Sequence, residues 1–199
     1  YYNNKIKITY IMTDAAALPM DFSNIVKVLR EKNLIHSTIT IGHAFGGDLE
    51  CVNIYNGLIA AQKIQKCDIA IVSMGPGIVG TGTQFGFSGI KQGNIIDAVN
   101  HLGGKPIAIP RISFADKRKR HNGISHHTIT VLDKICNTRS LIGIPTFEDA
   151  KLGYIKSQIK AIGLQTKHSI SYIQSMEIEK VLQGSNIRMA TMGRKLEQD

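Results

Sequence analysis

The sequence predicts an α/β protein with a mostly parallel, doubly wound, Rossmann-like sheet and helices on both faces. Two patterns carry this prediction. Short segments alternate apolar with polar residues, or are apolar throughout, as in strands, and between them apolar residues recur at helical spacing. Helices that alternate with strands connect parallel neighbours in a sheet covered on both sides. Since no stretch has the composition of a flexible linker, we expect residues 1–199 to form a single domain.

The strands and helices follow from these patterns in chain order. The expected strands cover residues 5–12, 37–42, 68–74, 105–110, 141–145, 168–173 and 187–191. The expected helices cover residues 22–29, 52–62, 95–102, 129–136, 155–162 and 177–183. Asp48 is expected to cap the second helix, because a short acidic side chain accepts from the free N–H groups of a first turn. Gly103 and Gly163 are expected to end two other helices.

Composition limits the classes of protein that fit. Hydrophobic residues make up 43% of the chain, aromatic residues only 6%, and tryptophan is absent, so the core must consist mainly of Ile, Val, Leu and Ala. No apolar run approaches the length of a membrane span. Three cysteines without a CxxC pair disfavour a disulfide framework, and we expect a cytoplasmic location. A homodimer is expected, because two-fold dimers are the commonest oligomers.

Positive charge favours an anionic partner. The formal net charge is +9, and RISFADKRKR (111–120) holds five Arg or Lys residues against one Asp. This segment either contacts the phosphate of a ligand or is a solvated loop or helix end, and Arg111, directly at the strand end, is the expected fixed contact to a small anion. Nucleic acid is disfavoured as a partner, because the chain shows no nucleic-acid-binding motif and no interleaved aromatic residues.

Polar residues follow each of the first four expected strands. Thr13 and Asp14 follow the first, GHAFGGD with His43 and Asp48 follows the second, MGPGIVGTGT (74–83) the third, and PRISFADKRKRHNGISHH the fourth. Ligands of open parallel sheets bind outside the carboxyl ends of the strands. The sequence therefore predicts a binding site at this edge.

The glycine-rich loop has the spacing G-x-G-x-x-G at Gly75, Gly77 and Gly80. Glycines leave backbone N–H groups free to face an anion. A dinucleotide fold is disfavoured, because further glycines delay the next helix to about residue 91 and Arg111, not an acid, ends the next strand. A tightly packed loop that binds nothing is the alternative. The expected anion-binding residues are Gly75, Gly77, Gly80, Thr81, Gly82, Thr83, Arg111, Ser113 and Arg118.

Histidines in these loops are candidates for acid–base chemistry, because imidazole titrates near neutral pH. We expect His43 or His126 to act as the acid or base, and Asp14 or Asp48 to orient it or to hold a cation. A metal site that combines one of His126 and His127 with His43, Asp14, Asp48 or Asp116 stays open, although no ligand spacing supports it. His126 and His127 are expected to diverge by about 100°, as neighbours on a helix do. No cofactor is assigned.

Three functions compete on these observations. The first is an enzyme acting on a small phosphorylated or nucleotide-like ligand at the carboxyl edge of the sheet. The second is a non-catalytic module that senses or binds such a ligand. The third is a nucleic-acid-binding protein that uses the KRKR stretch.

Several long segments resemble an uncharacterised bacterial family, the domain of unknown function 3866. They are ITYIMTDAAALP, TITIGHAFGGDLECVNIYNGL, VSMGPGIVGTGTQFGFSGI, AIPRISFADKRKRHNGISHHT and TMGR (191–194). Lys195 stands where the family has glycine or another small residue. The resemblance implies a chain that lacks the family's N-terminal region, and it implies no established activity or catalytic residue.

Overall fold

A four-stranded parallel sheet forms the first half of the computed structural model, which describes residues 6–75, 78–174, 190–191 and 194–195. Its strand order is β3 (Leu49–Cys51), β2 (Ser37–Ile41), β1 (Ile8–Thr13) and β4 (Ile69–Met74). Strands β1, β2 and β4 confirm three strands expected from the sequence, whereas β3 is an additional short strand that pairs in parallel with β2.

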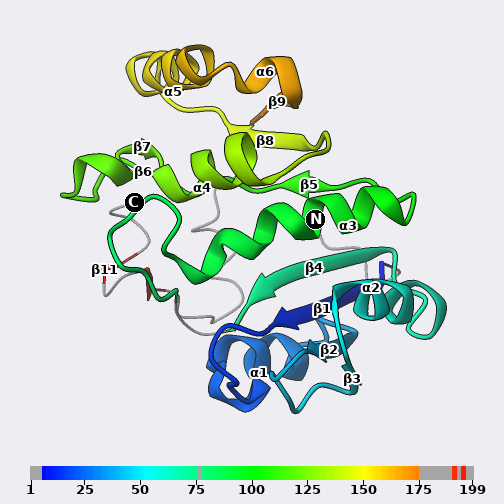
Figure 1. Ribbon diagram of the computed structural model, residues 1–199. Helices are drawn as coiled ribbons and strands as arrows, with labels where there is room; N and C mark the ends of the chain where they lie inside the picture. Colours follow the sequence, from blue (N-terminus) through cyan, green and yellow to red (C-terminus); the bar gives the residue numbers. More distant parts are fainter. Residues whose placement is uncertain (1–5, 76–77, 175–189, 192–193, 196–199) are drawn as a thin grey trace.

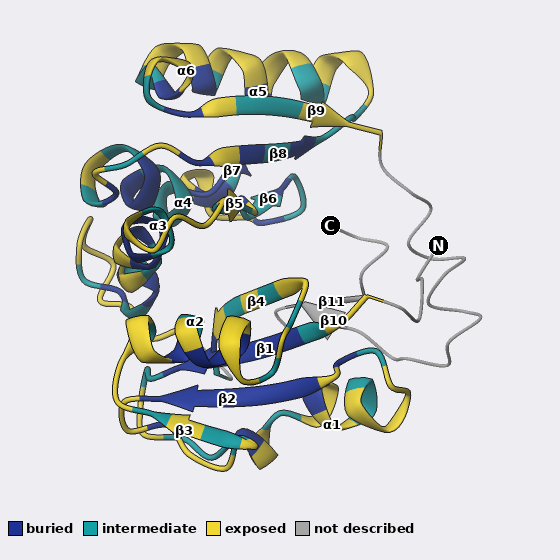
Figure 2. Ribbon diagram, turned by 90° about the vertical axis from the view of Figure 1, so that its right-hand side faces the viewer, coloured by how far each residue is buried: buried dark blue, intermediate teal, exposed yellow. Residues whose placement is uncertain are grey.

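A second parallel sheet has the order β5 (Ile107–Ala108), β8 (Leu141–Pro145) and β9 (Ser169–Ile173). The α/β class with parallel strands is confirmed, but the strands form two sheets where one continuous sheet was expected. Figure 2 shows the two sheets at separate levels, with α3 (Gln92–His101) beside the space between them. Strand β5 is short because Pro106 and Pro110, which have no N–H to donate, flank it.

Helices cover both sheets. The other α-helices of the described residues are α1 (Asn24–Glu31), α2 (Ile54–Lys63), α4 (His126–Thr130), α5 (Asp149–Ile162) and α6 (Leu164–Lys167). Helix α4 continues as a π-helical turn, Val131–Ile135, and α3 begins at Gln92, close to the expected start of the helix after the glycine loop. Asn53, not Asp48, caps α2, since its side chain accepts from the backbone N–H of Asn56. Gly163 ends α5 with a φ of 78°, as expected.

Strands β1 and β2 are buried on both faces, whereas the edge strand β4 leaves Ile69 and Ile71 exposed although its sequence is apolar throughout. On β1, Ile11 packs with Ile39 and Ala61 of α2, whereas Tyr10 and Met12 pack in the cluster that contains Val26 of α1. The second sheet packs against α5, where Ile155 and Ile159 contact Ile142 and Ile144. The alternate residues of β1 therefore pack into two different cores, one on each face of the first sheet.

Some expectations fall on residues that the structure does not describe. The helix expected at 177–183 lies outside the described residues, and so does the strand expected at 187–191 except for Ala190–Thr191. Ala190–Thr191 (β10) pairs antiparallel with Arg194–Lys195 (β11). In the described part of the chain, no helix combines the length and apolar character needed to span a bilayer. Cys51, Cys67 and Cys136 are free thiols.

Gly47 illustrates a tight approach between strands. A Cβ added there would lie 2.7 Å from the backbone nitrogen of Thr40 and 2.9 Å from the backbone oxygen of Leu49. We expect Gly47→Ala to lower the free energy of unfolding by about 2–3 kcal/mol, since overpacking must move backbone. Gly153→Ala on α5 is the matched control, because nothing lies within 4 Å of its added Cβ and alanine favours the helix by about 1 kcal/mol. Urea unfolding of both variants checks this, and equal effects would contradict it.

Candidate functional site

The polar residues around α4 form one cluster, which we call the histidine–arginine cluster. Its members are Arg111, Asp116, Arg118, Arg120, His121, Ser125, His126 and His127. The antiparallel hairpin of β6 (Ile112–Ser113) and β7 (Gly123–Ile124) assembles them, because its pairing places the two ends of the segment between the strands side by side. The backbone N–H of Ser125 donates to the carbonyl of Arg111. The green ribbon of Figure 1 shows β6, β7 and α4 on the side toward which β1 and β4 point.

Asp116 holds two of the three arginines of the cluster, Arg111 and Arg118. Its side chain is only 3% exposed and accepts from Nη2 of Arg111 at 3.1 Å, and from Nε and Nη2 of Arg118 at 3.0 and 2.8 Å. Hydrogen bonds from Arg118 keep the pKa of the Asp116 carboxyl far below its ordinary range, and the same pairing raises the pKa of Arg118. Asp116 is therefore a fixed negative charge that positions both guanidinium groups.

His121 lies buried at the centre of the cluster. Its Nδ1 is 3.0 Å from Nη1 of Arg111 and 2.7 Å from Oγ of Ser125. Because a guanidinium only donates, Nδ1 accepts and the ring proton lies on Nε2. Burial, with the positive charges of Arg118 and Arg111, lowers the pKa of His121 to about 4, so the ring is neutral at pH 7.

His126 and His127 stand beside His121. The ring centroids of His126 and His127 are 4.2 Å apart. The ring centroid of His121 lies 4.8 Å from that of His126 and 5.1 Å from that of His127. The expected divergence of these neighbours, which occupy the first turn of α4 after its cap Ser125, does not keep their rings apart. Burial is the main cause that lowers the pKa of both rings, to about 4 for His127. With one nitrogen taken from each ring, the three nitrogens lie within 4.8 Å of one another, close enough for a metal site.

The glycine-rich loop closes on itself and touches the cluster at two points. Its two arms pair, with Thr81 N–H donating to the carbonyl of Gly86 at 2.7 Å, so this N–H is used within the loop. Phe87 stacks on His127 with ring centroids 4.1 Å apart. At the exposed tip, a Cβ added to Gly82 would lie 3.6 Å from Nη1 of Arg120. The loop therefore reaches the cluster through its tip and its second arm.

Most of the other expected ligand-binding residues belong to this loop, and Ser113 lies on β6. Gly80 forms a bridge with Phe87, and the hydroxyls of Thr81 and Thr83 bond to each other at 2.9 Å. Gly75 packs over Met12 at the end of β4, and Gly77 lies outside the described residues. Ser113 is buried on β6, where its hydroxyl accepts from the backbone N–H of Asp116.

Three of the four expected catalytic residues lie in connections next to strands of the first sheet, outside the histidine–arginine cluster. Asp14 follows β1 and accepts from the backbone N–H of Ala17, and His43 is exposed after β2. Asp48 lies at the amino end of the sheet, because the chain returns along it to start β3 in parallel with β2. There its carboxylate accepts from Thr38 N–H at 2.8 Å and pairs with Arg30 at 2.7 Å. These bonds, opposed by burial, leave the pKa of Asp48 lowered. Only His126 of the four belongs to the histidine–arginine cluster.

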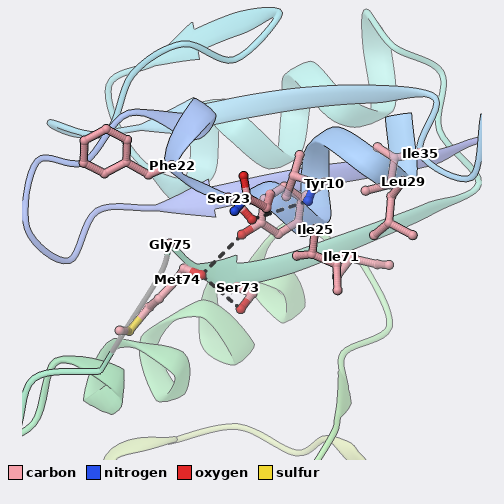
Figure 3. Close-up of a pocket in the computed structure, with 12 residues that line it drawn as sticks. Tyr10, Phe22, Ser23, Ile25, Leu29, Ile35, Ile71, Ser73, Met74 and Gly75 are labelled. Atoms are coloured by element: carbon pink, nitrogen blue, oxygen red, sulfur yellow. Dashed lines mark hydrogen bonds between the residues drawn. The ribbon is translucent and has the colours of Figure 1, made fainter. Parts of the chain in front are cut away.

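An apolar pocket of 460 Å³ lies apart from the cluster, between α1 and the end of β4 (Figure 3). Leu29, Ile35 and Ile71 contribute to its wall, and the Tyr10 hydroxyl donates to the Met74 carbonyl at 3.3 Å. Gly75 is the expected ligand-binding residue that lines it. Because its lining is mostly apolar, the pocket offers little acid–base or anion-binding chemistry.

Five members of the cluster were not predicted as site residues from the sequence. They are Asp116, Arg120, His121, Ser125 and His127. The available signal was the density of charge and imidazole within 116–127, where three histidines follow a basic run. The sequence alone does not reveal that β6 pairs with β7, and this pairing brings the segment back to Arg111.

Comparison with known proteins places the chain in a family without a described activity. No curated protein and no solved structure matches it. The family model described as "Protein of unknown function (DUF3866)" matches residues 1–199. The chain therefore belongs to the DUF3866 family, as its sequence motifs indicated.

Proposed function

We propose that the protein binds a small oxyanion of the phosphate class at the histidine–arginine cluster. The observation that carries this proposal is the charge of the cluster. Arg111, Arg118 and Arg120 each lower the pKa of at least one of the neighbouring imidazoles, while Asp116 pairs with only the first two of them. An environment that resists a further positive charge favours a negative one.

The groups around the cluster suit an oxyanion as hydrogen-bond donors. The Arg111 and Arg118 side chains remain 33% and 45% exposed, so donors not used by Asp116 are open to a ligand. The Thr81 and Thr83 hydroxyls stand on the loop whose tip lies beside Arg120. A nucleotide-like or sugar-phosphate ligand would place its phosphate here and its uncharged part along the glycine-rich loop.

Proton transfer is the chemistry that the site would add to binding. His126 and His127 are neutral at pH 7, which is the form of a general base. A bound anion would raise their pKa values and so make proton uptake easier. If the protein is an enzyme, we assign the acid–base role to His126, and a ligand-sensing module is the alternative for the same cluster.

Isothermal titration of the protein with inorganic phosphate and a nucleoside monophosphate, in the presence of EDTA, tests the proposal. We expect saturable binding that Arg120→Gln weakens by about fivefold, because one charge a few ångströms from an anion contributes about 1 kcal/mol in water. Lys160→Gln makes the same charge change on the exposed face of α5 and should leave the affinity as it was. Equal affinities for the two variants, or no binding, would overturn the proposal.

Two further assays, incubation with a phosphate ester and binding of nucleic acid, distinguish the competing functions. Release of product from a phosphate ester on long incubation, abolished by His126→Gln, would identify an enzyme; binding without product would identify a sensing module. Binding of duplex DNA or RNA that falls steeply with salt, in place of small-anion binding, would identify a nucleic-acid partner.

A further inference from the structure

We infer that His121, His126 and His127 form a binding site for one divalent first-row transition ion of the zinc class. Three imidazoles that each offer a nitrogen within 4.8 Å of the others are the set that zinc, cobalt, nickel and copper prefer. A tetrahedral ion with bonds of about 2.0–2.1 Å holds its ligand nitrogens roughly 3.4 Å apart. Side-chain movements of about 1 Å complete that geometry, which is within the reach of imidazole rotation.

The nitrogen left free for the ion can be identified on two of the three rings, His121 and His126. Nδ1 of His121 is engaged by Arg111 and Ser125, which leaves Nε2 as the ligand of that ring. Nε2 of His126 is buried, and the part of the chain that the structure describes gives it no hydrogen-bond partner. Burying a polar atom without a partner costs free energy, and a metal bond would supply the missing partner.

Ser125 is placed to orient the first ligand. When Nε2 of His121 binds an ion, its ring proton must lie on Nδ1, which then donates to Oγ of Ser125 at 2.7 Å. Nη1 of Arg111, which now donates to the same Nδ1, must then turn away. Metal binding would thus free one arginine donor while Asp116 keeps hold of Nη2.

The surrounding charge determines what else such an ion would bind. Asp116 already compensates part of the charge of Arg111 and Arg118, and three protein ligands leave a fourth position open on a tetrahedral ion. The arginines that lower the pKa values of these imidazoles also oppose a divalent ion, so an anionic fourth ligand such as hydroxide is expected to accompany the ion. The metal site does not rest on the proposed anion function, since its three ligands and their geometry stand without an oxyanion. The acid–base role assigned to His126 belongs to the metal-free protein, because a metal-bound imidazole nitrogen takes up no proton.

Titration of EDTA-treated and desalted protein with Co²⁺ in phosphate-free buffer tests the inference. We expect the visible absorption of imidazole-bound Co²⁺ to saturate at one ion per chain and to be displaced by Zn²⁺, whereas Mg²⁺, which prefers oxygen ligands, has no effect. His126→Gln and His127→Gln should each weaken Co²⁺ binding by at least tenfold. Ser125→Ala should weaken it by about tenfold, the size of a lost outer-shell bond.

Controls keep metal binding apart from folding and from anion binding. His101→Gln alters an exposed histidine that stacks on Tyr55 and should retain the affinity of the parent protein. Thermal unfolding without metal identifies any variant that fails to fold. His126→Gln is the variant least expected to unfold, because among the described residues Nε2 of that ring has no hydrogen-bond partner to lose. Absence of Co²⁺ absorption, or absorption that survives both His126→Gln and His127→Gln, would overturn the inference. The phosphate titration in EDTA is independent of this result.

Discussion

Replacing Asp116 with asparagine is expected to lower the free energy of unfolding by about 2–3 kcal/mol. The carboxylate is 3% exposed and accepts from both Arg111 and Arg118. An asparagine would turn an amide NH₂ toward one guanidinium and remove the negative charge that both need. Loss of one partner of a buried pair costs about 3–5 kcal/mol, and we reduce this because water screens the partly exposed arginines.

Urea or thermal unfolding measures the effect, which corresponds to a decrease in Tm of roughly 5–10 °C for a chain of this length. Asp133→Asn is the matched control, because Asp133 pairs with the exposed Lys134 at 2.9 Å and surface pairs contribute about 0–1 kcal/mol. If the two variants lost the same stability, Asp116 would not be the anchor of the cluster.

The second large effect is a loss of stability as the pH falls from about 6.5 to about 4, measured on metal-free protein in EDTA. Unfolded histidines take up a proton near pH 6.5, whereas His121 and His127 stay neutral in the folded protein down to about pH 4. Within this window the unfolded state binds more protons, so acid favours unfolding. The contribution of these two histidines to the free energy of unfolding is fully present above pH 6.5, and it is lost as the pH falls toward 4.

The size of this effect follows from the same pKa values. Each such histidine contributes up to about 1.4 kcal/mol per pH unit, and we expect a combined loss of about 3–5 kcal/mol after allowing for solvent near His127. The groups that face these rings are Arg111, Arg118, Arg120, Asp116 and His126. Asp116, whose pKa is lowered, loses its contribution only below the ordinary pKa of aspartate, which leaves the histidine window distinct.

Urea unfolding at several pH values measures the slope directly. His127→Gln should flatten the slope between pH 6.5 and 4, because one of the rings that resists protonation is removed. His101→Gln, at an exposed position on α3, should retain the slope of the parent protein. A stability that stays constant across this window would show that the buried rings are protonated as readily as in the unfolded chain.

Much of the secondary structure could be predicted from the sequence, because local apolar spacing fixes which residues face a core. The strands β1, β2, β4, β8 and β9, the helix α5 with its terminal Gly163, and the late start of α3 follow from such spacing. The long motifs also identified the family. The single domain over 1–199, the cytoplasmic location and the homodimer stay predictions.

Tertiary pairing decided what local spacing could not. Prolines on both sides of β5 shorten it, and the strands form two sheets. The parallel pairing of β3 with β2 carries Asp48 to the amino end of the sheet, far along the strands from the edge where its sequence position suggested it. A residue's distance from a strand end does not reveal in which direction the chain runs next.

The candidate site shows the same division. The sequence by itself determined that Arg111, Arg118 and His126 lie in one basic, histidine-rich connection at the carboxyl side of a strand. Only the β6–β7 hairpin and the Ser125 cap of α4 decided that His121 and His127 join them around a buried Asp116. Residue type and spacing specify which chemistry is available, but the long-range hydrogen bonds that close a loop specify which side chains share a site.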